Sequence, residues 1–398
     1  MKVSIIDEAF TGWTGHNAGY NFAIGEELSK RSIDCQVFAH QSLPDLPGAP
    51  VRVLPTFTQN THAAWPGPRW LPPGLVRLLR LIVMNYRHGV DLVRKVTPRI
   101  RDDEIVLIVI ESRYSSFAYG VWLLLLRLRR LRLTPIFVVH NVPSNILKSE
   151  MRFVRALARG HHVVLAAHTA AIARLCEDAT GQRCHLLPLP FLRAESGPRR
   201  ITAGDRAVTF TYLGVASAAK GFDLVAHAID DIEDLLASGA VRLTIQCNTY
   251  QSAEDLAELR SAVVARARAT QGIRVVGELS AEDYGREMEH ADVILIPNRP
   301  EFYEHALSGV FAEALAKGKP VIVSEGTYMA KELAEHGSGL TFQRGSATAL
   351  AQAVRTAAAR IAVLGEQASA ARTAWLAWHN PRQYVDIVLG LWSEGAST

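Results

Sequence analysis

A polar segment around residue 300 carries the groups of a phosphate site. It lies between two apolar runs typical of buried strands, Val293–Ile296 and Val321–Val323, and it enters a helix of small residues at Ser308 and Gly309. The first amides of a helix have no intrahelical partner and carry the positive end of the helix dipole. The N–H groups of Ser308, Gly309 and Val310 therefore suit a phosphate, and the segment predicts a ligand that bears one.

Glu313 lies about one turn further along the same helix. A carboxylate accepts hydrogen bonds only, so it can take two from the hydroxyls of a ribose diol. Helix amides that can bind a phosphate, followed by a carboxylate that can bind a ribose diol, together predict a nucleotide site.

This segment resembles the donor-binding block of the retaining GT-B glycosyltransferases of family 4, also described as group 1. The family pattern has two glutamates separated by seven residues, then a helix of small residues and G-x-P-V-[IV]. Glu313 matches the second glutamate, and residues 318–322 match the tail. His305 stands where the family has the first glutamate, which touches the donor sugar; Glu304 is one place off and Glu301 four. The resemblance implies that Glu313 holds the ribose and that His305 lies at the sugar.

A second loop leaves an apolar run at Leu213 and contains a single lysine, Lys220. Such a lysine can act as a point charge for a diphosphate, or it can be a surface lysine at a helix start. The loop resembles the family block G-R-x-x-x-x-K-G-F, with Gly214 and Lys220 in register. Val215 replaces the arginine of that block, so one of two customary cations is missing. Either another arginine replaces it, or the leaving group is less well neutralised.

Two further positions come from the first half of the chain. Gly15 matches the glycine-rich loop that lets the family's backbone approach the donor phosphate and the acceptor, with His16 and Asn17 on the acceptor side. His140 ends an apolar run and resembles the family's strand-end histidine at the donor sugar. The resemblance implies a catalytic role for His140; Glu111 ends the preceding run and is a weaker candidate.

Apolar runs and helical patterns alternate along both halves of the chain, which predicts α/β domains with parallel sheets. Residues 193–200 lack apolar periodicity and indicate a linker. The resemblance implies the GT-B fold: two Rossmann-like, doubly wound domains that face each other across a cleft, with a C-terminal helix that crosses back to the first. We predict an acceptor domain at 1–195, a nucleotide-sugar domain at 205–375 and the crossing helix at 380–398.

Composition narrows the classes of function. The net charge of +4 over 398 residues does not favour nucleic-acid binding. No acidic pair ends a strand and no Cys/His pattern has metal spacing, so we predict neither a metal nor a cofactor. Scattered cysteines and the lack of a membrane-length apolar run indicate a reduced, cytoplasmic protein. The cysteines are Cys35, Cys176, Cys184 and Cys247.

Residues 69–132 are strongly basic, with 13 Lys/Arg against 5 Asp/Glu. Arginines at positions 80, 87 and 94 repeat every seven residues beside apolar residues with helical spacing. One interpretation is an amphipathic helix with a solvated basic face. The other is a surface that contacts an anionic membrane or a phosphate-linked acceptor at the inner face of the membrane.

The sequence thus predicts a retaining transferase that moves a sugar from a nucleotide-diphosphate donor to a hydroxyl of a sugar or lipid-linked acceptor. The usual setting of the family is polysaccharide or glycolipid synthesis. Lys220 and the helix dipole would stabilise the leaving diphosphate in place of a metal ion. No carboxylate stands out as a nucleophile, which favours front-face displacement. The alternatives are a sugar-nucleotide epimerase, a pyridoxal-phosphate phosphorylase and a non-catalytic partner subunit of the same fold.

Overall fold

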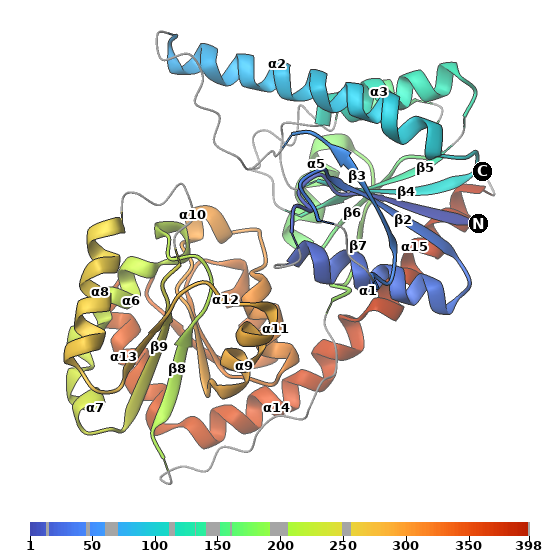
Figure 1. Ribbon diagram of the computed structural model, residues 1–398. Helices are drawn as coiled ribbons and strands as arrows, with labels where there is room; N and C mark the ends of the chain where they lie inside the picture. The colour runs from blue at the N-terminus through green and yellow to red at the C-terminus, as the bar shows by residue number, and fades with distance from the viewer. Residues whose placement is uncertain are drawn as a thin grey trace. The chain divides into compact units, whose positions relative to one another are not determined.

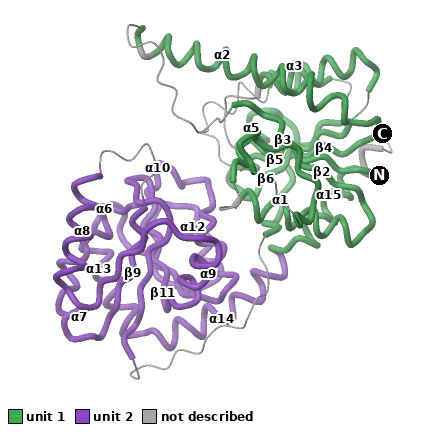
Figure 2. Tube along the Cα trace, viewed as in Figure 1, with its two compact units in different colours: residues 1–191, 379–398 green, residues 192–378 purple. Residues whose placement is uncertain are grey.

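A computed structural model of the chain divides into two compact units (Figures 1 and 2). Unit 1 comprises residues 1–191 and 379–398, and unit 2 comprises residues 192–378. The structure describes residues 1–12, 16–44, 48–59, 71–110, 116–131, 133–140, 152–159, 161–191, 206–248 and 256–396. The predicted linker at 193–200 lies outside these ranges.

Unit 1 is built on a seven-stranded parallel sheet with the order β3-β2-β1-β4-β5-β6-β7. The order reverses between β1 and β4, as in a doubly wound fold. The strands are β1 (Lys2–Ile6), β2 (Asp34–His40), β3 (Arg52–Phe57), β4 (Glu104–Ile110), β5 (Leu133–Val139), β6 (Val164–Ala167) and β7 (Cys184–Leu186).

Helices cover both faces of this sheet because its central strands are apolar on both sides. In β4, Ile105 and Leu107 pack with one core and Val106 and Ile108 with the other. The first core contains side chains of α1 and α15, and the second contains side chains of α3 and α5. Figure 1 labels these four helices around the sheet. The helices of unit 1 include α1 (His16–Lys30), α2 (Pro73–Asp91), α3 (Ser116–Leu128), α5 (Ala170–Thr180) and α15 (Pro381–Ala396), and a π-helical turn, η1 (Leu92–Val96), extends α2.

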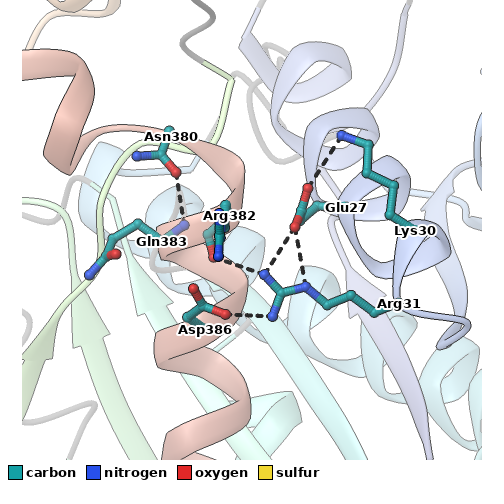
Figure 3. Close-up of polar contacts among 7 residues, drawn as sticks. All are labelled: Glu27, Lys30, Arg31, Asn380, Arg382, Gln383 and Asp386. Carbon is teal, nitrogen blue, oxygen red and sulfur yellow. Dashed lines mark hydrogen bonds and ion pairs between the residues drawn. The ribbon is translucent and has the colours of Figure 1, made fainter.

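The C-terminal helix α15 belongs to unit 1 and packs on α1. The hydroxyls of Tyr20 and Tyr384 lie 2.7 Å apart and both side chains are buried. Nearer the surface, the guanidinium of Arg31, the residue after α1, bonds Glu27 of α1 and Asp386 of α15 (Figure 3). The predicted return of the last helix to the first domain is therefore a feature of the fold.

Unit 2 has a six-stranded parallel sheet with the order β10-β9-β8-β11-β12-β13, which reverses between β8 and β11. The strands are β8 (Val208–Tyr212), β9 (Val241–Gln246), β10 (Ile273–Val276), β11 (Val293–Ile296), β12 (Val321–Ser324) and β13 (Gly339–Phe342). The flanking helices include α6 (Phe222–Asp231), α7 (Glu233–Ala237), α8 (Ala257–Ala269), α9 (Ala281–His290), α10 (Pro300–Tyr303), α11 (Gly309–Ala316), α12 (Tyr328–His336), α13 (Ala347–Ala359) and α14 (Ile361–Trp378).

The pattern of the sequence does not predict the edge strand β3, because this strand contains Pro55, which weakens a strand signal. The apolar pattern from Phe222 is typical of one continuous helix, but Ile232 leaves the helical conformation and divides it into α6 and α7. Pro381 begins α15, which is a separate helix from α14.

Candidate functional site

The loop after β8 and the segment after β11 follow neighbouring strands at the point where the strand order of unit 2 reverses. Ligands of open α/β sheets bind outside the carboxyl ends of strands at such a point. The candidate nucleotide residues Gly214, Lys220, His305, Ser308 and Glu313 all follow β8 or β11. The topology therefore brings both predicted motifs of unit 2 to one edge of its sheet.

Lys220 ends a short 3-10 turn, η3 (Ala218–Lys220), and its side chain folds back over Gly214. Gly214 has φ +114°, and a Cβ at this position would lie 3.0 Å from the Lys220 Nζ. The Gly214 N–H donates to Gln246 Oε1 at 2.7 Å, which fixes the loop to the end of β9. Glycine at this position thus makes room for the lysine side chain.

No acidic side chain of the described residues balances the charge of Lys220. Burial lowers its pKa below the ordinary value of lysine, and no group of the described residues hydrogen-bonds or pairs with its Nζ. Lys319, another lysine of unit 2, is buried but donates to the carbonyls of Glu289 and Ala291 at 2.7 Å. A desolvated ammonium without a partner is costly, so Lys220 has the character of a group kept for an anionic ligand.

The two loops are joined through Gly221 and Arg299. Gly221 has φ +67°, and a Cβ at this position would overlap the carbonyl oxygen of Pro297. The Arg299 backbone N–H donates to Ala219 O, and its guanidinium bonds Ala218 O and pairs with Asp223. Arg299 therefore holds the lysine turn in place, and its guanidinium is engaged by this structural role.

We expect Gly221→Ala to destabilise unit 2 strongly. The left-handed backbone costs about 1–2 kcal/mol for an alanine, and the clash with Pro297 adds about 1–3 kcal/mol of overpacking. Gly337→Ala is a matched control, because Gly337 has φ +68° and a methyl group there would meet no other atom within 4 Å. Denaturant unfolding of both variants should show the larger loss at Gly221; equal losses would mean that the close approach to Pro297 relaxes freely.

Helix α11 presents the predicted phosphate-binding amides. Ser308 is its N-cap residue, and the Ser308 hydroxyl makes no capping bond to the helix. The amides of Gly309 and Val310 are therefore first-turn N–H groups without an intrahelical acceptor. Trp375 of α14 braces the helix by donating from Nε1 to Ala312 O at 3.1 Å and packing edge-on against Phe311.

Glu313 is half-buried on α11, and Tyr284 of α9 lies beside it. The Tyr284 hydroxyl is buried, and burial together with the charge of Glu313 and a contact between the two side chains raises the tyrosine pKa well above its ordinary value. Tyr284 thus stays a neutral phenol next to the carboxylate. Tyr284 is a neighbour that the sequence did not identify, because 29 residues separate it from Glu313.

His305 lies on the loop between α10 and α11 and is partly exposed. Its Nε2 is 3.7 Å from a carboxylate oxygen of Glu304. A partly exposed contact of this length, which is an ion pair only when the imidazole is protonated, contributes little to stability. The assignment of His305 to the donor sugar stays a prediction.

In unit 1, the buried carboxylate of Asp7 organises the turn that follows β1. It accepts from the side-chain amides of Asn17 and Asn21, both on α1, and from the backbone N–H of Ala9. The Asn17 amide, which the resemblance assigned to the acceptor side, is thus directed at Asp7. Gly15 and Glu111 lie outside the described residues, and His16 begins α1.

His140 follows β5, and His168 follows the neighbouring strand β6. Their Nε2 atoms lie 3.2 Å apart and their rings are nearly perpendicular. Tyr20 packs edge-on against both rings, with centroid distances of 5.1 and 5.6 Å. The sequence identified His140 but gave no sign of His168, since the pair forms only when the two strands align.

No group of three or more His, Cys, Asp or Glu side chains in the described ranges has the arrangement of a metal site. Among the same residues, no helix is long and apolar enough to cross a membrane.

Comparisons with known proteins identify the class of this fold. Residues 207–360, most of unit 2, match the family model described as Glycosyl transferases group 1. Sucrose-phosphate synthase from Thermosynechococcus elongatus is 16% identical, with a TM-score of 0.67 and 100% of both chains covered. The chain therefore has the GT-B fold, and the predicted resemblance to group 1 is confirmed over residues 207–360.

Two further solved structures have the same fold. Anabaena HepE in complex with UDP is 16% identical, with a TM-score of 0.64 and full coverage of both chains. WaaG, a glycosyltransferase involved in lipopolysaccharide biosynthesis, is 14% identical, with a TM-score of 0.61 and coverage of 98% of this chain and 100% of WaaG. No curated protein sequence matches the chain.

Proposed function

We propose that the protein is a retaining glycosyltransferase that transfers a sugar from a nucleoside-diphosphate donor to an acceptor hydroxyl. The observation that carries the proposal is the desolvated ammonium of Lys220, which pairs with no group of the described residues and lies at the strand-order reversal of unit 2. The group 1 match over the same unit supports glycosyl transfer, and solved HepE complexes with UDP and UDP-glucose support a nucleotide-sugar as the donor.

In this reaction the main task of the protein is to stabilise the leaving diphosphate. As the glycosidic C–O bond to the donor breaks, negative charge accumulates on the diphosphate oxygens. The ammonium of Lys220 and the first amides of α11 are preorganised to receive that charge, which is the larger part of catalysis in sites of this type. In this proposal Glu313 holds the ribose diol, while His305 and His140 contact the sugar.

The proposed stereochemical course is front-face displacement. The acceptor hydroxyl attacks the anomeric carbon on the side from which the diphosphate departs, and its proton passes to a donor phosphate oxygen. This route forms the new glycosidic bond with retained configuration and needs no enzyme nucleophile. We propose a lipid-linked or sugar acceptor in polysaccharide or glycolipid synthesis, without a metal or other cofactor.

The main alternative is a nucleotide-binding partner subunit without turnover. It is favoured by His305 in place of the family's first glutamate and by Val215 in place of its arginine, since Arg299 is engaged by Asp223 and Ala218. An epimerase is a second alternative, because it would bind the same nucleotide-sugar through the same residues but would need no acceptor.

Donor turnover separates these functions. The protein is incubated with each nucleoside-diphosphate sugar, with and without lipid-linked and oligosaccharide acceptors, and the products are followed by NMR. Retained anomeric configuration in an acceptor-dependent product supports the proposal. Inverted configuration, conversion of the donor sugar without acceptor, or binding without any turnover would each contradict it.

A further inference from the structure

Helix α2 exposes its apolar stripe instead of burying it. Ile82 is 55% exposed and Tyr86 is 72% exposed, whereas Met84 and His88 on the opposite side of the helix are buried. A surface helix normally directs its apolar stripe to the core. Here the stripe faces away from the core of unit 1. It continues on α3, which packs beside α2 (Figure 1). Its exposed members are Leu75, Leu78, Leu79, Ile82 and Tyr86 of α2 and Val121, Leu125 and Leu128 of α3.

Arginines flank this stripe. Arg87 and Arg94 lie seven residues apart along one side of it, both are exposed, and neither pairs with an acidic side chain of the described residues. Arg129 and Arg130 are exposed at the end of α3. Apolar residues bordered by long cationic side chains are the pattern of a surface that lies in the headgroup region of an anionic bilayer.

A groove of about 410 Å³ runs between α2 and α3 within the same surface. Its walls are almost entirely apolar, and Arg94 stands among the lining residues. The side chains that form it include Tyr86, Val90, Val93, Phe117, Val121 and Leu125. An apolar groove with a cation at its margin has the chemistry to take a lipid chain and to hold an anionic headgroup.

We propose that α2 and α3 dock unit 1 on an anionic lipid membrane, with the apolar stripe in the headgroup region and the α2–α3 groove open to a lipid chain. The charge of the flanking arginines favours anionic lipid as the occupant over a second copy of the chain, whose matching surface would carry the same positive charge. This surface would give the proposed transferase access to a lipid-linked acceptor. The observations that support the surface are independent of those that support the nucleotide site.

Sedimentation of the full chain with vesicles tests the proposal. We expect binding to equimolar phosphatidylglycerol and phosphatidylcholine, none to phosphatidylcholine alone, and weaker binding in high salt. Ile82→Ser with Tyr86→Ser, and Arg87→Glu with Arg94→Glu, should each lower vesicle affinity by at least about tenfold. The controls Val363→Ser and Arg268→Glu change exposed residues of unit 2 and should bind as the native chain does.

Failure to bind either vesicle, or equal losses in the control pair, would overturn the proposal. So would a native dimer that the Ile82 and Tyr86 substitutions convert to a monomer, because the stripe would then be a protein interface. Transfer to a water-soluble acceptor should be unchanged in all variants. A defect in lipid binding is thereby distinguished from a defect in the proposed reaction.

A separate contact in unit 1 supports a second inference. His168 Nδ1 lies 2.9 Å from the carbonyl oxygen of Leu187, so Nδ1 carries the proton of that bond. The ring is buried, and this burial, with the nearby His140 and His379, lowers the pKa of His168 well below its ordinary value. A neutral imidazole with Nδ1 protonated has a bare Nε2. The 3.2 Å contact then requires His140 Nε2–H to donate to His168.

We infer that His168 is a positioning residue that fixes the ring orientation and tautomer of His140. Any hydrogen bond from the His140 ring to a sugar hydroxyl must then use Nδ1. This inference rests on the proposed role of His140 for its effect on transfer, but the tautomers themselves can be measured in the free protein.

Nitrogen NMR of the histidine rings and two substitutions test this inference. We expect a protonated Nδ1 and an unprotonated Nε2 in His168. His168→Leu removes the acceptor and should lower kcat about tenfold to hundredfold at unchanged donor KM, because the ring of His140 loses its orientation. His168→Gln retains an acceptor oxygen and should recover most of the rate. The opposite tautomer in His168, or equal kcat in the Leu and Gln variants, would overturn it.

Discussion

Lys220→Met should lower the rate of sugar transfer by about 10²–10³-fold, the usual effect of removing one preorganised group that stabilises developing charge. The same substitution should leave the melting temperature unchanged or raise it. Burial lowers the pKa of Lys220 in the folded chain, so its charged form is disfavoured there, and methionine removes that cost. Calorimetry and steady-state kinetics of the same preparation measure both effects.

The lowered pKa of Lys220 defines how stability and diphosphate affinity should change with pH. Its folded-state pKa lies below the unfolded value, so the unfolded chain binds more protons between the two and this group's contribution to stability rises with pH there. Diphosphate binding requires the ammonium, so affinity should fall as pH rises through the lowered pKa. The fall should begin at lower pH than an ordinary lysine would give, and it should be absent in Lys220→Met.

Lys331→Met is the matched control, because Lys331 is an exposed lysine of the same unit. It should change neither transfer nor the pH profile. If Lys220→Met unfolds the protein more readily and retains nucleotide affinity, Lys220 is a structural lysine and the assignment to the diphosphate is wrong.

Glu313→Ala should weaken nucleoside-diphosphate binding by about 10–100-fold, which corresponds to about 1.5–3 kcal/mol for hydrogen bonds to a charged group. The native protein should bind a ribonucleotide more tightly than its 2′-deoxy analogue. In the alanine variant this preference should disappear, while affinity for inorganic pyrophosphate should stay the same. Isothermal titration with the three ligands isolates the diol contact from the phosphate contact.

Tyr284→Phe controls for the neighbouring contact of Glu313. It removes the phenol beside the carboxylate but leaves the carboxylate in place, so the ribose preference should persist. We expect Glu313→Ala to leave the melting temperature nearly unchanged. A large loss of stability with an intact preference for ribose would show that Glu313 only packs α11 against α9.

The α/β class could be predicted because alternating apolar runs and helical patterns favour parallel strands joined by helices, and the family resemblance supplied the GT-B arrangement. Gly214 and Lys220 could be paired from the sequence, since both belong to one loop. The edge strand β3 could not be found in the same way, because Pro55 and a single partner strand weaken its signal.

Contacts between distant segments mark the limit of such predictions. Tyr284 beside Glu313 and His168 beside His140 depend on which helices and strands become neighbours, and neither pair has a local pattern. The face that α2 exposes is a similar case. Helical spacing identifies its apolar stripe, but only the packing of Met84 and His88 shows that the stripe faces away from the core.

We propose that the carboxyl edge of the unit 2 sheet holds a nucleoside diphosphate. A thermal-shift screen of the full chain against UDP, GDP, ADP, dTDP and CDP tests it most directly. A ligand at a hundredfold excess over its Kd stabilises the folded state by about 2.7 kcal/mol. We expect a clear upward shift with at least one diphosphate and a much smaller shift in Lys220→Met. No shift with any of the five, or equal shifts in the native chain and the variant, would contradict it.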